Sequence, residues 1–348
     1  MKHNYSLTPF LIGTAAMVII LAGVKMASEI VVPFLLSLFI AIICSPIIKF
    51  MTRRKVPHPV ALSLLFLLIL LIFFFLIGLI NSSITEFTAS IPQYKLLLVE
   101  RLNDITALAQ RFHIPFSVQR ETILKHLDPS SIMNFMSRLL LSFSNVVSNA
   151  FVLILVVIFM LLEAPTAKRK IVIAFSRDDK ETGAEEQHID RILQGVISYL
   201  GVKTFVSLLT AVCIWGLLEL FGVQYAVLWA TLSFLFNYIP NIGSIIAAIP
   251  IIVQALLLNG FSVGLGVTVG VIIINMVIGN VIEPRLMGRT LGLSTLVVFM
   301  SLLFWGWLLG TVGMLLSVPL TMALKIILQS NPSARRYAVL LGDIDEKK

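Results

Sequence analysis

The most informative part of the sequence is residues 220–282, which read LFGVQYAVLWATLSFLFNYIPNIGSIIAAIPIIVQALLLNGFSVGLGVTVGVIIINMVIGNVI. These 63 residues contain no Asp, Glu, Lys or Arg. A helix of about 20 apolar residues crosses a bilayer, so the stretch is long enough for three crossings. It is interrupted by the segment NYIPNIG at 237–243, by Pro250 and by Asn-Gly at 259–260. The pattern predicts broken helices in the membrane, which are tolerated only where neighbouring groups satisfy the freed backbone.

The rest of the chain extends the same apolar pattern. The 348 residues are 58% hydrophobic and 13% charged, whereas a soluble domain has about 45–50% apolar and about 25% charged residues. This composition excludes a soluble globular domain, a disordered chain and a disulfide scaffold. We predict an all-α polytopic membrane protein with about eight or nine membrane-embedded helical segments. Further runs without a fixed charge cover residues 4–24, 30–48, 56–85, 139–162, 204–218 and 290–324.

The order of apolar and polar segments predicts how the chain is divided. The run 290–324 is too long for one span, and Gly310 near its middle favours a helical hairpin. Three basic residues and no acid follow the second span at 53–55, so this loop and both termini are predicted to be cytoplasmic. The net charge of +8 belongs to such loops, and no nucleic-acid binding is predicted. The predicted segments are spans one to three (1–80), an amphipathic helical segment on the outer side (81–145), span four (146–162), a cytoplasmic polar helical segment (163–200), a transport region of broken or re-entrant helices (201–328) and a cytoplasmic tail (329–348).

Residues that could carry enzyme chemistry are missing from the sequence. There is no phosphate-binding loop, no nucleophile elbow, no zinc-protease motif and no Cys-x-x-Cys. The five histidines form no cluster with metal-ligand spacing, and Cys44 and Cys213 lie inside apolar runs. We therefore predict that the protein is not an enzyme and that it has no catalytic residue, metal or cofactor.

Polar residues inside the broken region are the candidate solute pathway. Helix ends at membrane depth carry partial charges, and transporters build binding sites from them. An amide both donates and accepts hydrogen bonds, which suits a neutral polar ligand. Two alternatives stay open: residues 237–243 form a loop at the membrane surface, and single polar residues bond a neighbouring helix. The candidates are Asn237, Pro240, Asn241, Gly243, Gln254, Asn275 and Asn280.

A second candidate site is the acid at the end of the uncharged stretch. Glu283 is followed by Arg285, and Asn280 lies one helical turn before Glu283, on the same face of a regular helix. One interpretation is a salt bridge that fixes a loop. The other is a protonatable group coupled to transport, since ionisable residues in spans are costly and often functional. Lys203 borders an uncharged run and is expected to extend its ammonium group towards water.

Three short segments of the sequence together resemble a known family. They are NYIPNIGS at 237–244, EPRLMG at 283–288 and LLSVPL at 315–320, and the likeness continues through Val32-Pro33-Phe34 over nearly the whole chain. The chain is similar to the autoinducer-2 exporter family. This resemblance implies a multi-pass protein of the bacterial inner membrane, a homo-oligomer, that exports autoinducer-2, a small, neutral, highly hydroxylated furanone. Members of the family are also described as Na⁺(Li⁺)/H⁺ antiporters.

Three functions therefore remain open from the sequence. The favoured one is a secondary transporter that exports autoinducer-2 or a similar small polar solute, with proton coupling through Glu283 as one form of it. The alternatives are a Na⁺(Li⁺)/H⁺ antiporter and a membrane scaffold or sensor that uses residues 81–138 to bind a partner. Neutral hydrogen-bonding side chains suit a polyol better than an ion, which favours the first. The expected partners are the solute, the lipid bilayer and further copies of the chain.

Overall fold

The computed structural model of the chain describes residues 7–76, 78, 150–175, 182–240, 242–287, 292–330 and 334–342. Within these ranges the regular structure is helical, apart from an isolated β-bridge between Leu293 and Gly342. The predicted outer segment, residues 81–145, lies outside the described residues. The all-helical class that the composition predicts is confirmed for the described part of the chain.

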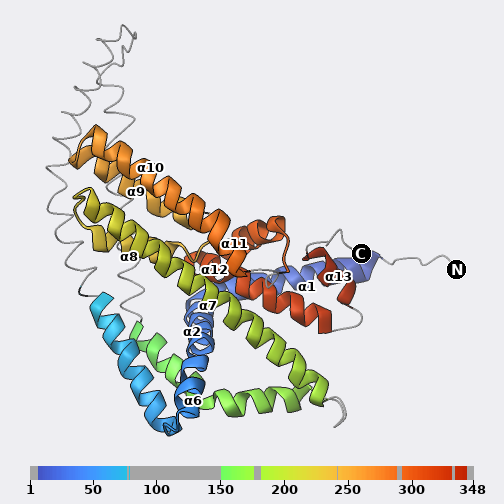
Figure 1. The fold of residues 1–348 in the computed structure, drawn as a ribbon. Helices are drawn as coiled ribbons and strands as arrows, with labels where there is room; N and C mark the ends of the chain where they lie inside the picture. Colours follow the sequence, from blue (N-terminus) through green and yellow to red (C-terminus); the bar gives the residue numbers. More distant parts are fainter. Residues whose placement is uncertain are drawn as a thin grey trace. The chain divides into compact units, whose positions relative to one another are not determined.

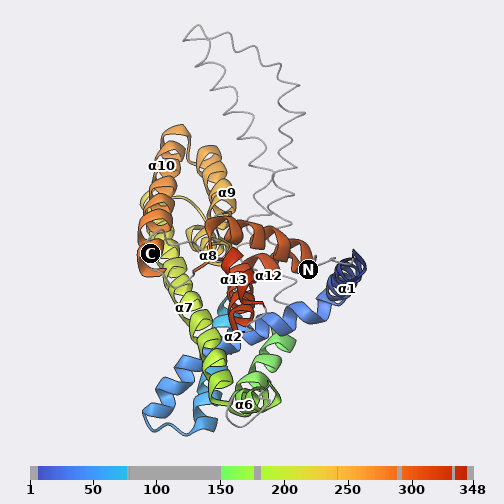
Figure 2. The same ribbon diagram turned by 90° about the vertical axis from the view of Figure 1, so that its right-hand side faces the viewer.

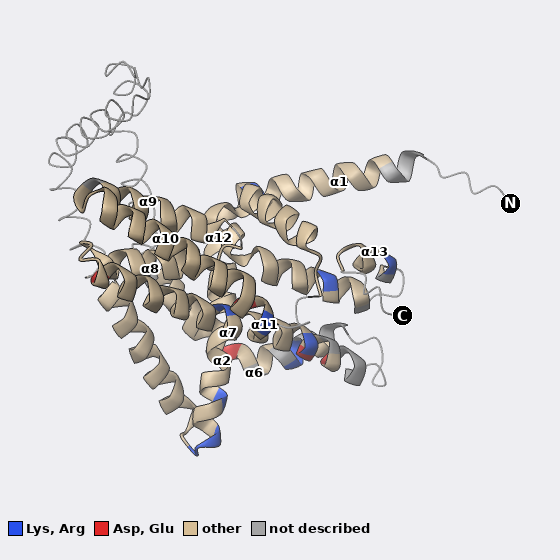
Figure 3. Cartoon of the chain, turned by 45° about the horizontal axis from the view of Figure 1, so that its top comes forward, with Lys and Arg blue, Asp and Glu red and all other residues tan. Residues whose placement is uncertain are grey.

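Many of the described helices are apolar enough for a membrane. Five are also long enough to cross it by length and composition: Ser28–Arg53, His58–Leu76, Ile189–Leu220, Phe261–Met287 and Thr295–Gln329, of which the last is interrupted at Gly310. Shorter apolar helices cover Leu11–Met26, Val152–Ala164, Ala226–Phe236 and Gly243–Leu256. Figure 3 shows no charged residue along the helices Ala226–Phe236 and Gly243–Leu256 of the long uncharged stretch. A polytopic membrane protein follows from these helices, and the exact number of crossings stays a prediction.

The chain forms two compact units, and the first combines three separate parts of the sequence, Met1–Ser63, Val152–Gly201 and Arg289–Lys348. Within it α12 packs against α1, α2 and α13. Ser37 of α2 donates a hydrogen bond to the carbonyl of Leu153 in α6, at 3.2 Å. The helices of this unit, drawn in Figure 1, are α1 (Leu7–Met26), α2 (Ser28–Arg53), most of α6 (Ala150–Phe175), the first part of α7 (Thr182–Leu220), α12 (Thr295–Ser330) and α13 (Arg335–Leu340).

Helix α12 is a hairpin of two helical arms. Gly310 has φ 70° and ψ −151°, a conformation that is essentially restricted to glycine. Trp305 Nε1 donates a hydrogen bond to Thr321 Oγ1 at 3.0 Å, although 16 residues of continuous helix would separate them by about 24 Å. A Cβ atom on Gly313 would lie 2.0 Å from the carbonyl oxygen of Trp305, so the arms approach closely only with glycine there. The hairpin predicted for residues 290–324 is confirmed.

The second unit contains Leu64–Phe151 and Val202–Gly288, and it holds the long uncharged stretch. Helix α7 continues unbroken across residue 200, where the sequence suggested a boundary, and the two units divide it between Gly201 and Val202. Helix α9 packs on α8 and on α10, and Figure 2 shows α9 and α10 side by side, as Figure 1 does. After the second part of α7 come α8 (Ala226–Phe236), α9 (Gly243–Leu258), α10 (Phe261–Val277), the π-helical turn η1 (Ile278–Ile282) and α11 (Glu283–Met287).

Two glycines let α10 pack tightly against α7. A Cβ atom on Gly266 would lie 2.7 Å from the ring of Phe221, and one on Gly270 would lie 2.5 Å from the side chain of Leu217. The two glycines are four residues apart, so they share one face of α10. Small residues at this spacing allow membrane helices to approach closely. The seam positions α10 so that its next turns face the site described below.

Candidate functional site

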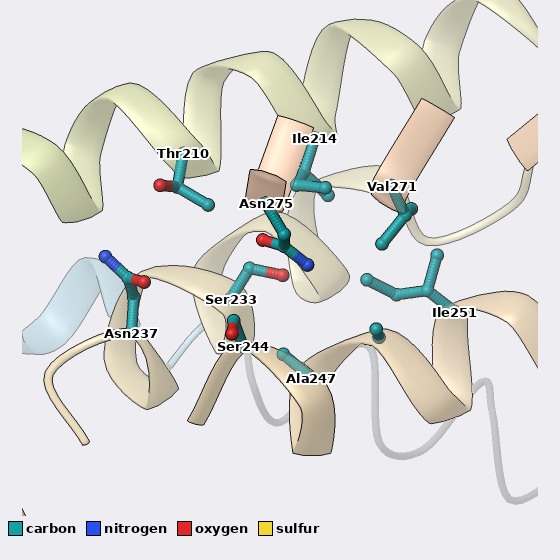
Figure 4. Close-up of a pocket in the computed structure, with 10 residues that line it drawn as sticks. Thr210, Ile214, Ser233, Asn237, Ser244, Ala247, Ile251, Val271 and Asn275 are labelled. Atoms are coloured by element: carbon teal, nitrogen blue, oxygen red, sulfur yellow. The ribbon is translucent and has the colours of Figure 1, made fainter. Parts of the chain in front are cut away.

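The second unit contains a small cavity between four helices. Its volume is about 10 Å³, enough for about one water molecule. Figure 4 shows side chains from α7, α8, α9 and α10 converging on it. The lining residues are Thr210, Ile214, Ser233, Asn237, Ser244, Ala247, Ala248, Ile251, Val271 and Asn275.

One wall of the cavity is polar and carries no charge. Thr210, Ser233, Asn237, Ser244 and Asn275 supply three hydroxyl and two amide side chains from four helices (Figure 4). Ser233 is 3% exposed, and its Oγ atom has no hydrogen-bond partner. A buried hydroxyl without a partner is costly. A water molecule or a solute hydroxyl placed in the cavity could satisfy the Ser233 hydroxyl.

The break between α8 and α9 forms the tip of a hairpin that is fastened to α7. Asn237 Nδ2 donates to Ser207 Oγ at 3.0 Å, and Tyr238 donates its hydroxyl proton to Thr204 Oγ1 at 2.8 Å. A Cβ atom on Gly243 would lie 1.8 Å from the carbonyl oxygen of Phe236, so the tight tip requires glycine. Two polar side chains at the break thus find hydrogen-bond partners on α7.

A buried ion pair lies beside this tip. Lys203 Nζ donates to Glu283 Oε1 at 2.5 Å, and the two side chains are 4% and 19% exposed. The expectation that Lys203 extends towards water is therefore wrong. The side chain is buried because α10 and α11 return alongside α7 and bring Glu283 to its level. Burial of each charge is tolerable because the other compensates it. Arg285 is exposed on α11.

The π-helical turn Ile278–Ile282 comes directly before Glu283. A π-helical turn takes up more residues than an α-helical turn, so it shifts the faces of the positions that follow it. Asn280 is exposed, whereas Glu283 is largely buried. The two side chains therefore differ in environment, although a regular helix would place them on one face. Single π-turns of this kind are frequent at functional sites.

The other predicted pathway residues have separate positions. Asn237 and Asn275 meet at the cavity, and Pro240 is buried in the hairpin tip. Gln254 does not line the cavity: it accepts a hydrogen bond from Trp229 Nε1 at 2.7 Å and donates to the carbonyl of Gln224 at 2.8 Å. Gln254 thus links α9 to α8 and the preceding turn. Asn241 lies outside the described residues.

Sequence reasoning passed over two hydroxyls of the cavity, Ser233 and Ser244, and gave Thr210 little weight. Helical spacing could have found two of these three. Ser233 lies four residues before Asn237, and Thr210 lies three residues after Ser207, so each shares a helix face with a polar neighbour. Ser244 had no such signal, because it follows directly on the break.

These features together define the class of protein. The described residues contain long apolar helices, a broken hairpin, a neutral polar cavity and a buried ion pair, and they include no group of three or more His, Cys, Asp or Glu residues able to hold a metal. Such sites between broken helices are typical of membrane transporters. A model of the family described as AI-2E family transporter matches residues 14–332. The chain belongs to the AI-2E transporter family, and the resemblance drawn from its motifs is confirmed.

Individual relatives differ in their sequence identity with this chain. A Haemophilus influenzae protein, whose name refers to transport but to no solute, is 68% identical over 100% of both chains. The AI-2 transport protein TqsA of Escherichia coli (strain K12) is 44% identical, over 95% of this chain and 94% of its own. A more distant relative, the sodium-lithium/proton antiporter of Halobacillus andaensis, is 24% identical over 84% of this chain and 87% of its own.

Proposed function

We propose that the protein is a secondary transporter that exports autoinducer-2 or a similar small, neutral, polar solute across the bacterial inner membrane, with both termini in the cytoplasm. The observation that carries the proposal is the cavity at Ser233, whose buried hydroxyl lacks a hydrogen-bond partner. The identity of 44% with an AI-2 transport protein supports the choice of solute.

The chemistry of the cavity favours a neutral solute. Hydroxyl and amide groups both donate and accept hydrogen bonds, so they match the hydroxyl groups of a polyol. The described part of this unit contains four charged residues, Lys203, Glu219, Glu283 and Arg285, and none of them lines the cavity. A charged solute would lose its hydration there without a partner charge, which is costly.

The cavity is too small for the solute in this conformation. A volume of about 10 Å³ admits a water molecule and no larger solute. We propose that the α8–α9 hairpin moves away from α7 to admit the solute, which requires release of the bonds at Asn237 and Tyr238. Glu283 is proposed as the residue that couples this movement to protons.

Efflux from proteoliposomes loaded with autoinducer-2 tests the proposal. Ser233→Ala and Asn275→Ala each remove a cavity group and are expected to lower efflux about tenfold, the effect of one or two lost hydrogen bonds. Thr231→Val on α8 and Thr268→Val on α10 are matched controls, since both hydroxyls donate to carbonyls of their own helix. Efflux at the wild-type rate in Asn275→Ala would show that the solute takes another path.

A second function is favoured by the size of the cavity. A space for about one water molecule, lined by hydroxyl and amide oxygens, is also suitable for a dehydrated Na⁺ or Li⁺. The 24% identity with a sodium-lithium/proton antiporter supports this alternative. Empty proteoliposomes containing a pH-sensitive dye distinguish the two functions. Proton flux driven by Na⁺ or Li⁺ and reduced in Asn275→Ala would indicate an antiporter; its absence, with autoinducer-2 efflux, would indicate the exporter.

A further inference from the structure

We propose that Lys203 is the counter-cation of a proton-operated latch. While Glu283 is ionised, its pair with Lys203 holds α11 against α7 and keeps the tip of the α8–α9 hairpin in place; a proton on Glu283 releases both. The inference rests on the proposed function, because the latch controls access to the same cavity. It assigns to Lys203 a role in coupling that the sequence did not indicate.

The position of three contacts on α7 supports the latch. Lys203 pairs with Glu283, the adjacent Thr204 accepts the hydrogen bond from Tyr238, and Ser207, one turn further along, accepts the bond from Asn237. Thr210, on the following turn, already lines the cavity. A single stretch of α7 therefore holds both the hairpin tip and the ion pair at one end of the cavity. A shift of this stretch disturbs all three contacts together.

The surrounding charges leave Lys203 and Glu283 to compensate each other. Among the described residues of this unit the other charged groups are Glu219 and Arg285, and both are exposed. Glu219 lies 16 residues along α7 from Lys203, about 24 Å away. The titratable group that the hairpin tip brings to this stretch is the Tyr238 phenol, which donates to Thr204. Lys203 lies near the middle of the apolar helix Ile189–Leu220, far from either end.

The proton balance of the latch is simple. One proton from water adds to a carboxylate oxygen of Glu283 and forms a neutral acid, while Lys203 remains an ammonium ion. The buried ammonium then has no counter-charge, which is strongly unfavourable in a low-dielectric site. Lys203 and its stretch of α7 therefore separate from α11. Loss of the proton from Glu283 restores the attraction.

The backbone next to Glu283 is suited to such a movement. The π-helical turn Ile278–Ile282 links α10 to the residue that would move. A π-turn can be accommodated or relaxed within an α-helix without breaking it. The glycine seam at Gly266 and Gly270 holds the remainder of α10 on α7 at the other end. The end that carries Glu283 can thus shift while the helix stays packed.

A cysteine in the cavity reports opening without the need for a solute. Thr210→Cys is introduced into a chain in which Cys44 and Cys213 are replaced by Ala, and its reaction with a membrane-permeant maleimide is followed from about pH 3 to about pH 9, a range whose acidic end protonates ordinary carboxylates. At each pH the rate is divided by that of the same cysteine in Glu283→Gln, which cancels the ionisation of the thiol. Glu219→Gln, the same change at the exposed end of α7, is the matched control.

The expected result has a defined direction. At alkaline pH the probe reacts about tenfold more slowly with Glu283 present than in Glu283→Gln, because the ionised pair holds the latch closed. At acidic pH the two rates converge. Lys203→Met labels fast throughout, and Glu219→Gln behaves as its parent. A ratio that does not vary with pH, or slow alkaline labelling in Lys203→Met, would overturn the latch.

A second variant covers the case in which the charge variants do not fold. Tyr238→Phe removes one hydrogen bond of the hairpin tip and leaves the ion pair intact, so labelling at alkaline pH should rise several-fold while the pH dependence remains. Unchanged labelling in Tyr238→Phe contradicts the latch as well. The proposed function fails separately, through efflux that is indifferent to Ser233→Ala and Asn275→Ala, since labelling measures access and not transport.

Discussion

Each unit of the molecule contains a helical hairpin, and the two hairpins are built alike. The first joins α8 to α9, and the second is formed by the two arms of α12. In each, a glycine allows one arm to touch a carbonyl of the other, Gly243 in the first and Gly313 in the second. In each, a tryptophan donates a hydrogen bond to a polar side chain on the opposite arm: Trp229 to Gln254, and Trp305 to Thr321.

The hairpins differ in what their buried hydroxyls do. In the second, Ser301, Ser317 and Thr321 donate to carbonyls of their own helix, so their polar atoms are satisfied locally. In the first, Ser233 has no partner and faces a cavity with hydroxyl and amide groups from neighbouring helices. A hairpin of this kind can thus have all its buried hydroxyls hydrogen-bonded, or it can line a polar cavity. Both hairpins have a broken backbone, so the feature that distinguishes the candidate binding site is the Ser233 hydroxyl without a hydrogen-bond partner.

The glycines test whether the two hairpins share their construction. Gly243→Ala and Gly313→Ala would place Cβ atoms 1.8 Å and 2.0 Å from carbonyl oxygens, so each should destabilise the protein by about 3 kcal/mol. Thermal unfolding in detergent measures the loss. Gly216→Ala on α7, where nothing lies within 4 Å, should be neutral or stabilising by up to about 1 kcal/mol. A loss of stability in Gly313→Ala without one in Gly243→Ala would show that the two hairpins are not built alike.

The tryptophan bonds compare the strength of the links between arms. Gln254→Leu removes two hydrogen bonds, to Trp229 and to the Gln224 carbonyl, and should cost about 1–2 kcal/mol. Thr321→Val removes the one bond between the arms, to Trp305, together with the local bond to the Ser317 carbonyl, and should cost about 0.6 kcal/mol. Autoinducer-2 efflux should persist in both variants. If Gln254→Leu abolished efflux in a folded protein, Gln254 would belong to the pathway after all.

The serines test the difference between the hairpins. Ser233→Ala removes a buried hydroxyl without a partner, so it should stabilise the protein by about 1 kcal/mol while lowering efflux. Ser317→Ala removes a hydroxyl that is bonded within its helix, so it should lower stability slightly and leave efflux unchanged. Calorimetry and efflux measured on the same preparations give both quantities. The most informative expected result is that Ser233→Ala raises the stability and lowers the efflux rate. A fall in both stability and efflux would mean that Ser233 serves packing.

The smallest effect is expected at a contact of the second hairpin with α1. Lys25 Nζ lies 4.2 Å from the ring centre of Trp307, which is 54% exposed. Lys25→Met should cost about 0.5 kcal/mol, the low end for an exposed cation–π contact, and Lys25→Arg should retain most of it. Unfolding temperatures of the two variants provide the measurement. A larger loss in Lys25→Met would mean that the second hairpin depends on α1 more than its own contacts suggest.

Two residues show how far the candidate site could be predicted. Asn237 and Asn275 were recognisable because an amide inside an uncharged run is expensive, and both line the cavity. The partner of Glu283 was not recognisable, because Lys203 is 80 residues away in the chain. Lys203 lies close to Glu283 only because of the position along α7 at which α10 and α11 pack. Asn280 shows the same dependence on a local detail, since a π-helical turn separates its environment from that of Glu283.

The amino-acid sequence alone indicates that this protein is helical and apolar, where its helices break and which family it belongs to. Run length, glycine, proline and missing charge act over a few neighbouring residues, so they can be read directly from the chain. The packing of the helices was needed to show that Ser233 faces a cavity, that Gln254 links helices and that Lys203 pairs with Glu283. These outcomes depend on packing between helices that are distant in sequence, where a small shift in register changes which polar groups meet.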